Sequence, residues 1–205
     1  MHTLISLKPS RTSNLVMQRL VTELIKTIVS KAFKSNHPHL LGRPVVAPNS
    51  CPIFANCSAL ESNNSVGVKD SNITAMTVLR HSGIVFAFNS EIWKKFKLGE
   101  LVSFNDNKTG KPSLRNTVYE PQEGDMPLPP IQGIKDLQKR GSLFCVCDLA
   151  TKVYGSAVAK KMNLDPDKVY QEMVKGILPG VKLVPSGVWA LGRAQNNNCA
   201  YIFAG

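Results

Sequence analysis

Short apolar runs alternate with stretches of helical spacing from residue 73 to the end of the chain. Ile73–Leu79 is a compact run rich in β-branched side chains, as in a buried strand. Three similar runs follow it: Ser142–Cys147, Val181–Val184 and Ala200–Phe203. Four stretches with helical spacing or helix-capping residues accompany them: 134–140, 148–162, 166–175 and 187–197. This alternation predicts parallel βαβ units, and hence an α/β protein built as a three-layer α/β/α sandwich with a mostly parallel sheet.

Capping residues and a long irregular stretch divide this part of the chain further. Asp165 is expected to cap a helix that has Pro166 at its first position. Ser90 is expected to cap a short helix that Gly99 ends. Residues at about 103–131 contain Asn, Gly and Pro throughout, and such a length is rarely left irregular in compact domains. We therefore interpret this loop as a segment with a function of its own, such as a flap.

The first 72 residues have a different composition. Residues 15–33 have apolar side chains at helical spacing, and Ser35–Asn72 is rich in His, Pro, Asn and Ser, as in a linker or loop. No acidic residue precedes Glu23, and a basic, hydroxylated start is typical of a transit peptide. The alternatives are a helix that packs on the domain or lies on a membrane surface. We divide the chain into 1–72, a basic helix with a linker-like segment, and 73–205, the α/β domain.

The amino-acid composition and the net charge exclude some classes of protein. Hydrophobic residues make up 43% of the 205 residues, which excludes a wholly disordered chain. No apolar run approaches the roughly 18 to 20 residues that span a bilayer, so no transmembrane segment is predicted. The net charge of +11 is compatible with an acidic partner, but basic residues are not interleaved with aromatic ones, so nucleic-acid binding is not indicated. With neither a secretory signal nor a twin-arginine pair, a cytoplasmic location is favoured.

The cysteines and the strand ends give the candidate chemistry. The five cysteines are too irregularly spaced for a disulfide framework: 51, 57, 145, 147 and 199. In an open parallel sheet, ligands bind beyond the carboxyl ends of the strands, which here carry His81, Cys147 and Ser186. Cys145 shares the face of Cys147 because side chains alternate along a strand. A thiolate at Cys147 faces the start of the next helix, although Asp148 beside it disfavours negative charge.

Other interpretations of these residues stay open. Buried cysteines often only fill space, and this holds most for Cys145 inside its strand. His81 is equally compatible with a structural role. Cys145, Cys147 and His81 together are weak evidence for a metal, because a second Cys/His pair is missing, so neither a metal nor a cofactor is predicted. Gly-rich phosphate loops, GxSxG elbows and HExxH helices do not occur in the sequence.

Several segments together resemble the DsrE/DsrF-like family over about residues 70–205. They are ITAMTVLRHSGIVFAFN (73–89), RGSLFCVCDLA (140–150) and ILPGVKLVPSGVWALGRAQNNNCAYIFAG (177–205). The resemblance implies a flavodoxin-like fold, often assembled as a homo-oligomer, and in some members a strand-end cysteine that carries sulfur as a persulfide. That cysteine corresponds to Cys147, with Cys145 offering the same face. The relatives with a long insertion before this strand are exported with a twin-arginine signal, which this sequence does not show.

One strand of the family is not recognisable in this sequence. The opening strand of the family, central to its sheet, has no clear counterpart in residues 1–72. Either Pro44–Ala47 is a degenerate strand or the usual first strand is missing, and a missing strand leaves an edge that an oligomer can cover.

Two functions from different classes follow. The first is a sulfur carrier rather than a turnover enzyme, in which Cys147 holds a sulfane sulfur, Cys145 supports or resolves it, and His81 and Ser186 orient the bound group. Its partners are a sulfur donor, a sulfur acceptor and further copies of the chain. The second is a non-catalytic module for ligand binding or oligomeric assembly, with structural cysteines.

Overall fold

The computed structural model describes residues 37–42, 53–127, 131–197 and 199–203. In this part of the chain, five strands form one parallel sheet in the order β4-β3-β2-β1-β5. The strands are β1 (His37–Gly42), β2 (Ile73–Leu79), β3 (Leu143–Cys147), β4 (Val181–Val184) and β5 (Ala200–Phe203). The predicted α/β class and parallel sheet are confirmed.

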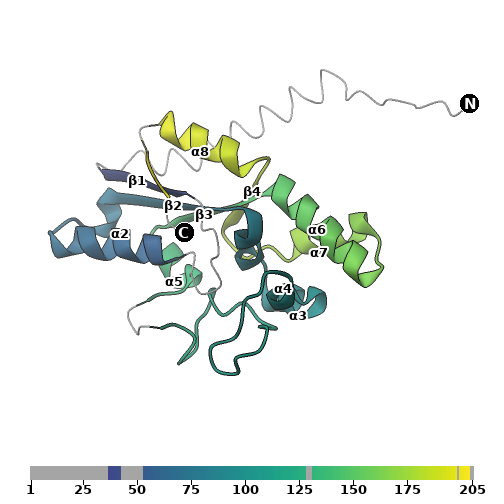
Figure 1. Cartoon of the computed structure of the whole chain (residues 1–205). Helices are drawn as coiled ribbons and strands as arrows, with labels where there is room; N and C mark the ends of the chain where they lie inside the picture. Colours follow the sequence, from purple (N-terminus) through teal and green to yellow (C-terminus); the bar gives the residue numbers. More distant parts are fainter. Residues whose placement is uncertain (1–36, 43–52, 128–130, 198, 204–205) are drawn as a thin grey trace, which may run out of the picture.

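Helices connect the strands and lie on both faces of the sheet. They are α2 (Phe54–Ser65), α3 (Ser90–Phe96), α4 (Leu98–Leu101), α5 (Ile134–Lys139), α6 (Asp148–Met162), α7 (Pro166–Lys175) and α8 (Gly187–Gln195), with 3₁₀ segments η1 (Asp70–Asn72) and η2 (His81–Ala87). Figure 1 shows α8 above the sheet and α2 and α5 below it. This arrangement is compatible with a three-layer sandwich. None of the described helices is both long and apolar enough to cross a bilayer.

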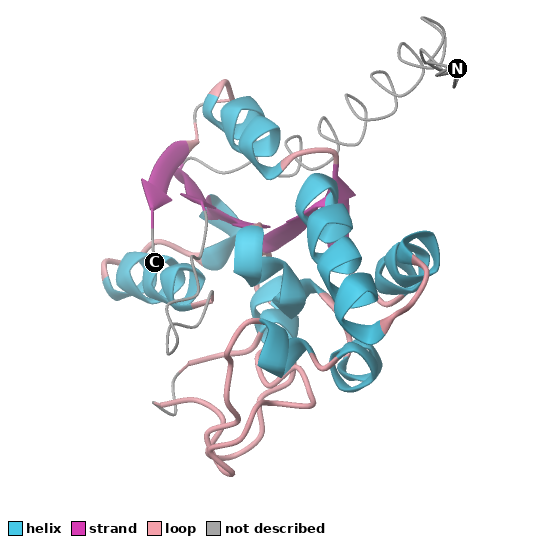
Figure 2. Cartoon of the chain, turned by 45° about the vertical axis from the view of Figure 1, so that its right-hand side comes forward, coloured by secondary structure: helices cyan, strands magenta, loops and turns pink. Residues whose placement is uncertain are grey.

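Two apolar clusters pack on the opposite faces of the sheet. Every side chain of β2 is buried, as the continuous apolar run predicts for an interior parallel strand. The smaller cluster lies under α8 and includes Met76, Val78 and Cys145. The larger cluster lies on the other face, where the Trp93 indole donates a hydrogen bond to the carbonyl of Val85 at 2.8 Å. The sheet is therefore covered from both sides (Figure 2).

The prediction of a linker over Ser35–Asn72 is wrong for two of its stretches. β1 pairs with β2 on one side and with β5 on the other, so an interior strand is present where the sequence left a gap. Ile53, the N-cap residue of α2, is buried together with Cys57 and Leu60 of the helix, and the three recur at helical spacing on one side of the segment. Asn and Ser around these positions weaken the periodic signal, and burial against the sheet compensates for their poor helix propensity.

The remaining expected elements lie in the N-terminal region, around residues 89–99, and from residue 134 onward. The amphipathic helix over 15–33 and the strand at Pro44–Ala47 lie outside the described residues. The helix expected from a Ser90 cap is capped instead by Asn89, whose side chain accepts the N–H of Ile92 at 3.0 Å, and Ser90 is its first residue. It ends at Lys97 in a left-handed conformation, and Gly99 lies inside α4 rather than ending a helix. The strand and helix expectations from residue 134 onward are confirmed to within two residues.

The register of the sheet brings the ends of three strands together. Leu79 of β2 is paired with Val146 of β3, and Cys147 of β3 is paired with Val184 of β4. Because the strands are parallel, the residues that follow them emerge at one edge of the sheet.

Candidate functional site

A pocket opens where β2, β3 and β4 end. Its volume is about 340 Å³, within the range of small-molecule sites. It is lined by Arg80, His81, Cys147, Leu149, Ala150, Val153, Tyr154, Ser186, Gly187 and Val188. Three of the four residues singled out from the sequence, Cys147, His81 and Ser186, therefore share one cavity.

Cys147 joins the last position of β3 to the start of α6. It is the N-cap residue of α6, and its Sγ accepts the N–H of Ala150 at 3.4 Å. Thr151 donates its hydroxyl to the carbonyl of Cys147 at 2.9 Å, which fixes the backbone of the cap. Only 6% of Cys147 is exposed, although it lines the pocket. The start of a helix offers N–H donors and a positive dipole end, so this position favours negative charge on a sulfur.

The carboxylate of Asp148 is held by α7 and by α6 itself. Its two oxygens accept hydrogen bonds from the hydroxyl of Tyr170 at 2.7 Å and from Nζ of Lys152 at 2.8 Å. Burial, together with the bond to Asp148 and its charge, raises the pKa of Tyr170 to about 12. Asp148 is not among the residues that line the pocket. Because Lys152 and Tyr170 both donate to the Asp148 carboxylate, its negative charge repels a charged sulfur on Cys147 less strongly.

The start of α8 forms the opposite side of the pocket. Ser186 is the N-cap residue of α8, but its side chain makes no capping hydrogen bond. A Cβ built on Gly187 lies 3.2 Å from both Cβ of Arg80 and Cγ1 of Val78, tighter than ordinary van der Waals contact. Glycine at this position therefore lets the first turn of α8 approach the end of β2 closely. The first N–H groups of α8 have no acceptor within the helix.

Two basic side chains follow β2 at the same edge. Arg80 is half-buried and lines the pocket. Within the described ranges, its guanidinium makes neither a hydrogen bond nor an ion pair. His81 is exposed and adopts a left-handed backbone conformation, with φ of +49°. A half-buried cation without a counter-charge makes this end of the pocket suited to an anion.

Cys145 lies outside this pocket. It is 2% exposed and belongs to the apolar cluster under α8. Burial and, to a lesser degree, the neighbouring Cys147 raise the pKa of the Cys145 thiol to about 12. The thiol is therefore neutral at physiological pH and closed off by packing.

The remaining wall of the pocket is apolar. Leu149, Val153 and Val188 line it, although 59%, 58% and 58% of these side chains are exposed. Tyr154 is half-buried beside them, and burial raises the pKa of its hydroxyl, which stays protonated at neutral pH. Exposed aliphatic side chains gathered at a cavity are a usual mark of a binding surface.

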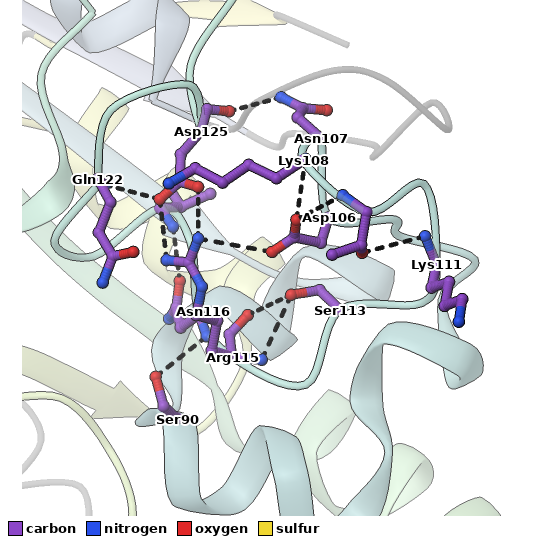
Figure 3. Close-up of polar contacts among 12 residues, drawn as sticks. Ser90, Asp106, Asn107, Lys108, Lys111, Ser113, Arg115, Asn116, Gln122 and Asp125 are labelled. Carbon is purple, nitrogen blue, oxygen red and sulfur yellow. Dashed lines mark hydrogen bonds and ion pairs between the residues drawn. The ribbon is translucent and has the colours of Figure 1, made fainter.

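The described residues of the loop at 103–131 do not line this pocket. Arg115 bridges it by ion pairs to Asp125 and Asp106, and Asp125 also accepts the N–H of Gln122 at 2.7 Å (Figure 3). Asn116 anchors the loop to the core by donating to the carbonyls of Phe86 and Phe88 at 3.0 and 2.8 Å. No described residue of the loop lines the pocket, so the structure does not show a flap over it.

Sequence reasoning missed Arg80 and the apolar wall. Leu149 and Val153 lie in the stretch 148–162, which was predicted as a helix, and their i, i+4 positions do not tell whether that face of the helix is buried. Arg80 carried a usable signal, because it directly follows a buried strand whose end was already assigned to the site.

Metal ligands do not gather anywhere in the described part of the chain. No group of three or more His, Cys, Asp or Glu side chains is placed there to hold a metal ion. No family model, no curated protein and no solved structure matches this chain.

Proposed function

We propose that this protein carries sulfane sulfur as a persulfide on Cys147. The resemblance of residues 70–205 to the DsrE/DsrF-like family is one support for the proposal. The observation that carries it is the position of Cys147: its sulfur lies at the start of α6 and lines a pocket that Arg80 also lines, and Arg80 has no counter-charge in the part of the chain that the structure describes. An added sulfur on Sγ extends into this cavity, where its negative charge meets the positive end of a helix and a guanidinium.

The surrounding residues take supporting roles. Ser186 is the N-cap residue of α8, but its hydroxyl makes no capping hydrogen bond and is therefore available to a bound group. His81 stands at the mouth as a second nitrogen donor or cation. Cys145 is packed away from the cavity, so the proposal uses one cysteine, and release occurs by attack of a partner's thiol on the outer sulfur.

The test is the intact mass of the reduced protein after treatment with inorganic polysulfide. The wild type is expected to gain one sulfur, Cys147→Ala to gain none, and Cys145→Ala, the matched control, to gain one as the wild type does. Circular dichroism establishes that each variant is folded. A folded wild type that gains no sulfur, or a Cys147→Ala variant that still gains it, contradicts the proposal.

A second candidate function is a binding or assembly module with structural cysteines. The exposure of Leu149, Val153 and Val188 favours it, because such a surface is usually covered by a ligand or another subunit. The strand that the sequence interpretation lacked is present as β1, paired with β2 and β5, so an edge left by a missing strand no longer argues for a homo-oligomer. This function predicts that Cys147 is alkylated no faster than Cys145 in the folded protein.

A further inference from the structure

The distribution of polar and apolar groups in the pocket indicates what kind of molecule it takes. The polar groups gather where the strands end: Arg80, His81, Ser186 and the first N–H groups of α8. The aliphatic groups, Leu149, Val153 and Val188, stand on the outer wall. A ligand that satisfies both ends has an anionic head and an apolar body.

We propose that the pocket binds organic sulfonyl anions, and that its sulfur donor is an organic thiosulfonate (R–SO₂–S⁻) with an apolar group R. The anionic head and the apolar body are inferred from the lining of the pocket, whereas the choice of a sulfonyl head and the transfer step rest on the proposed function. The head meets the guanidinium of Arg80, which has no other partner in the described structure. The three aliphatic side chains of the wall, which are mostly exposed, are then covered by R.

The transfer needs no further reactant. The Cys147 thiolate attacks the outer sulfur of the thiosulfonate, forming a new S–S bond at Sγ. The bond between the outer sulfur and the sulfonyl sulfur breaks, and its electron pair leaves with the organic sulfinate (R–SO₂⁻). The persulfide keeps one negative charge, and the leaving group carries the other. Inorganic thiosulfate has the same outer sulfur but no apolar group that could contact the aliphatic wall of the pocket.

Binding is measured first with inert analogues, by calorimetry on the wild-type protein. Benzenesulfonate and methanesulfonate share the head and differ in the apolar body. We expect benzenesulfonate to bind at least about tenfold more tightly, because partial burial of a ring is worth upwards of about 1.4 kcal/mol. Leu149→Ser combined with Val188→Ser is expected to reduce this preference below about threefold, since it removes the apolar contacts.

Two further variants distinguish the contribution of the anionic head to the affinity from that of the apolar body. Arg80→Gln is expected to weaken both analogues about five- to tenfold and to leave their ratio unchanged. Leu164→Ser is the matched control: Leu164 is 44% exposed just beyond α6 but does not line the pocket, so its loss leaves affinity and ratio unchanged.

Transfer is then measured as the rate at which Cys147 gains sulfur from benzenethiosulfonate and from methanethiosulfonate. The ratio of the two rates is expected to exceed that for free cysteine by about tenfold. Tight, selective binding without transfer contradicts the carrier function and leaves the ligand class supported. Loading from polysulfide, with equal binding of the two analogues, overturns the ligand class and leaves the carrier function standing.

Discussion

Asp125 carries a side chain with no exposed surface, in a loop whose described residues form neither a helix nor a strand. Its oxygens face Arg115, which forms a bidentate ion pair with them, and the backbone N–H of Gln122 (Figure 3). Burial by itself raises the pKa of this carboxyl, but the bonds from Arg115 and Gln122 and the charge of Arg115 outweigh it, so the pKa is lowered. The charged carboxylate therefore stabilises the fold.

We predict that Asp125→Asn lowers the free energy of unfolding by about 2 kcal/mol at pH 7, because it removes a charge from hydrogen-bonded partners. A lowered folded-state pKa means that this contribution is complete above the ordinary value of about 3.9 and is lost as the pH falls through the folded-state value. The difference between wild type and variant in urea unfolding should then shrink from pH 5 toward pH 2. A difference that stays constant over this range contradicts the assignment.

At the scale of elements, glycines show where helices need close contact and where they do not. Gly192 lies inside α8, and a Cβ built on it meets no atom within 4 Å. A Cβ built on Gly99 of α4 lies 2.3 Å from the carbonyl oxygen and 2.5 Å from the nitrogen of Ser113. Backbone at that distance cannot give way without moving the loop that Ser113 belongs to.

These environments predict opposite effects of one substitution. Gly192→Ala should raise the free energy of unfolding by about 0.5–1 kcal/mol, since alanine loses less backbone entropy in a helix. Gly99→Ala should lower it by about 1–3 kcal/mol through overpacking. Thermal unfolding of the two variants beside the wild type measures both. An equal gain from both variants contradicts the contact at Gly99.

On the scale of the whole molecule, Arg140 joins segments that are about 70 residues apart in the chain. Its guanidinium donates to both oxygens of Asp70, at 2.7 and 3.1 Å, and to Asn64 at 2.7 Å, and it also contacts Glu61 and Gln132. The bond from Arg140 is the main cause that lowers the pKa of Asp70. The end of α5 is thereby tied to α2 and to the turn that leads into β2.

Arg140→Met is expected to lower the free energy of unfolding by about 2 kcal/mol, and Arg140→Lys by nearly as much, because an ammonium cannot match the planar set of donors. Lys139→Met is the control: its ion pair with Asp136 is mostly exposed and is worth at most about 0.5 kcal/mol. Urea denaturation measures all three. If Arg140→Lys equals the wild type, charge rather than hydrogen-bond geometry holds these segments together.

Local patterns accounted for most of the fold from residue 134 onward. The Asp165 cap, with its side chain accepting the N–H of Lys168 at 2.8 Å, and Pro166 at the first helical position define the start of α7 from neighbouring residues alone. β1 and α2 were missed because their stability depends on contacts with β2 and β5, which are distant in the chain. A strand of six residues that contains proline and histidine has no local pattern that predicts it.

The sequence by itself determined the α/β class, the order of most strands and helices, and the strand ends that carry His81, Cys147 and Ser186. These follow from periodicity and capping, which act over a few residues. Only the tertiary structure decided that Cys147 lines the pocket while Cys145, two residues away on the same strand, is sealed under α8. It also decided that Arg80 has no counter-charge among the described residues and that Leu149 and Val153 face outward. Burial and charge compensation depend on which distant segments pack together, and the periodicity of a short stretch of sequence does not predict those contacts.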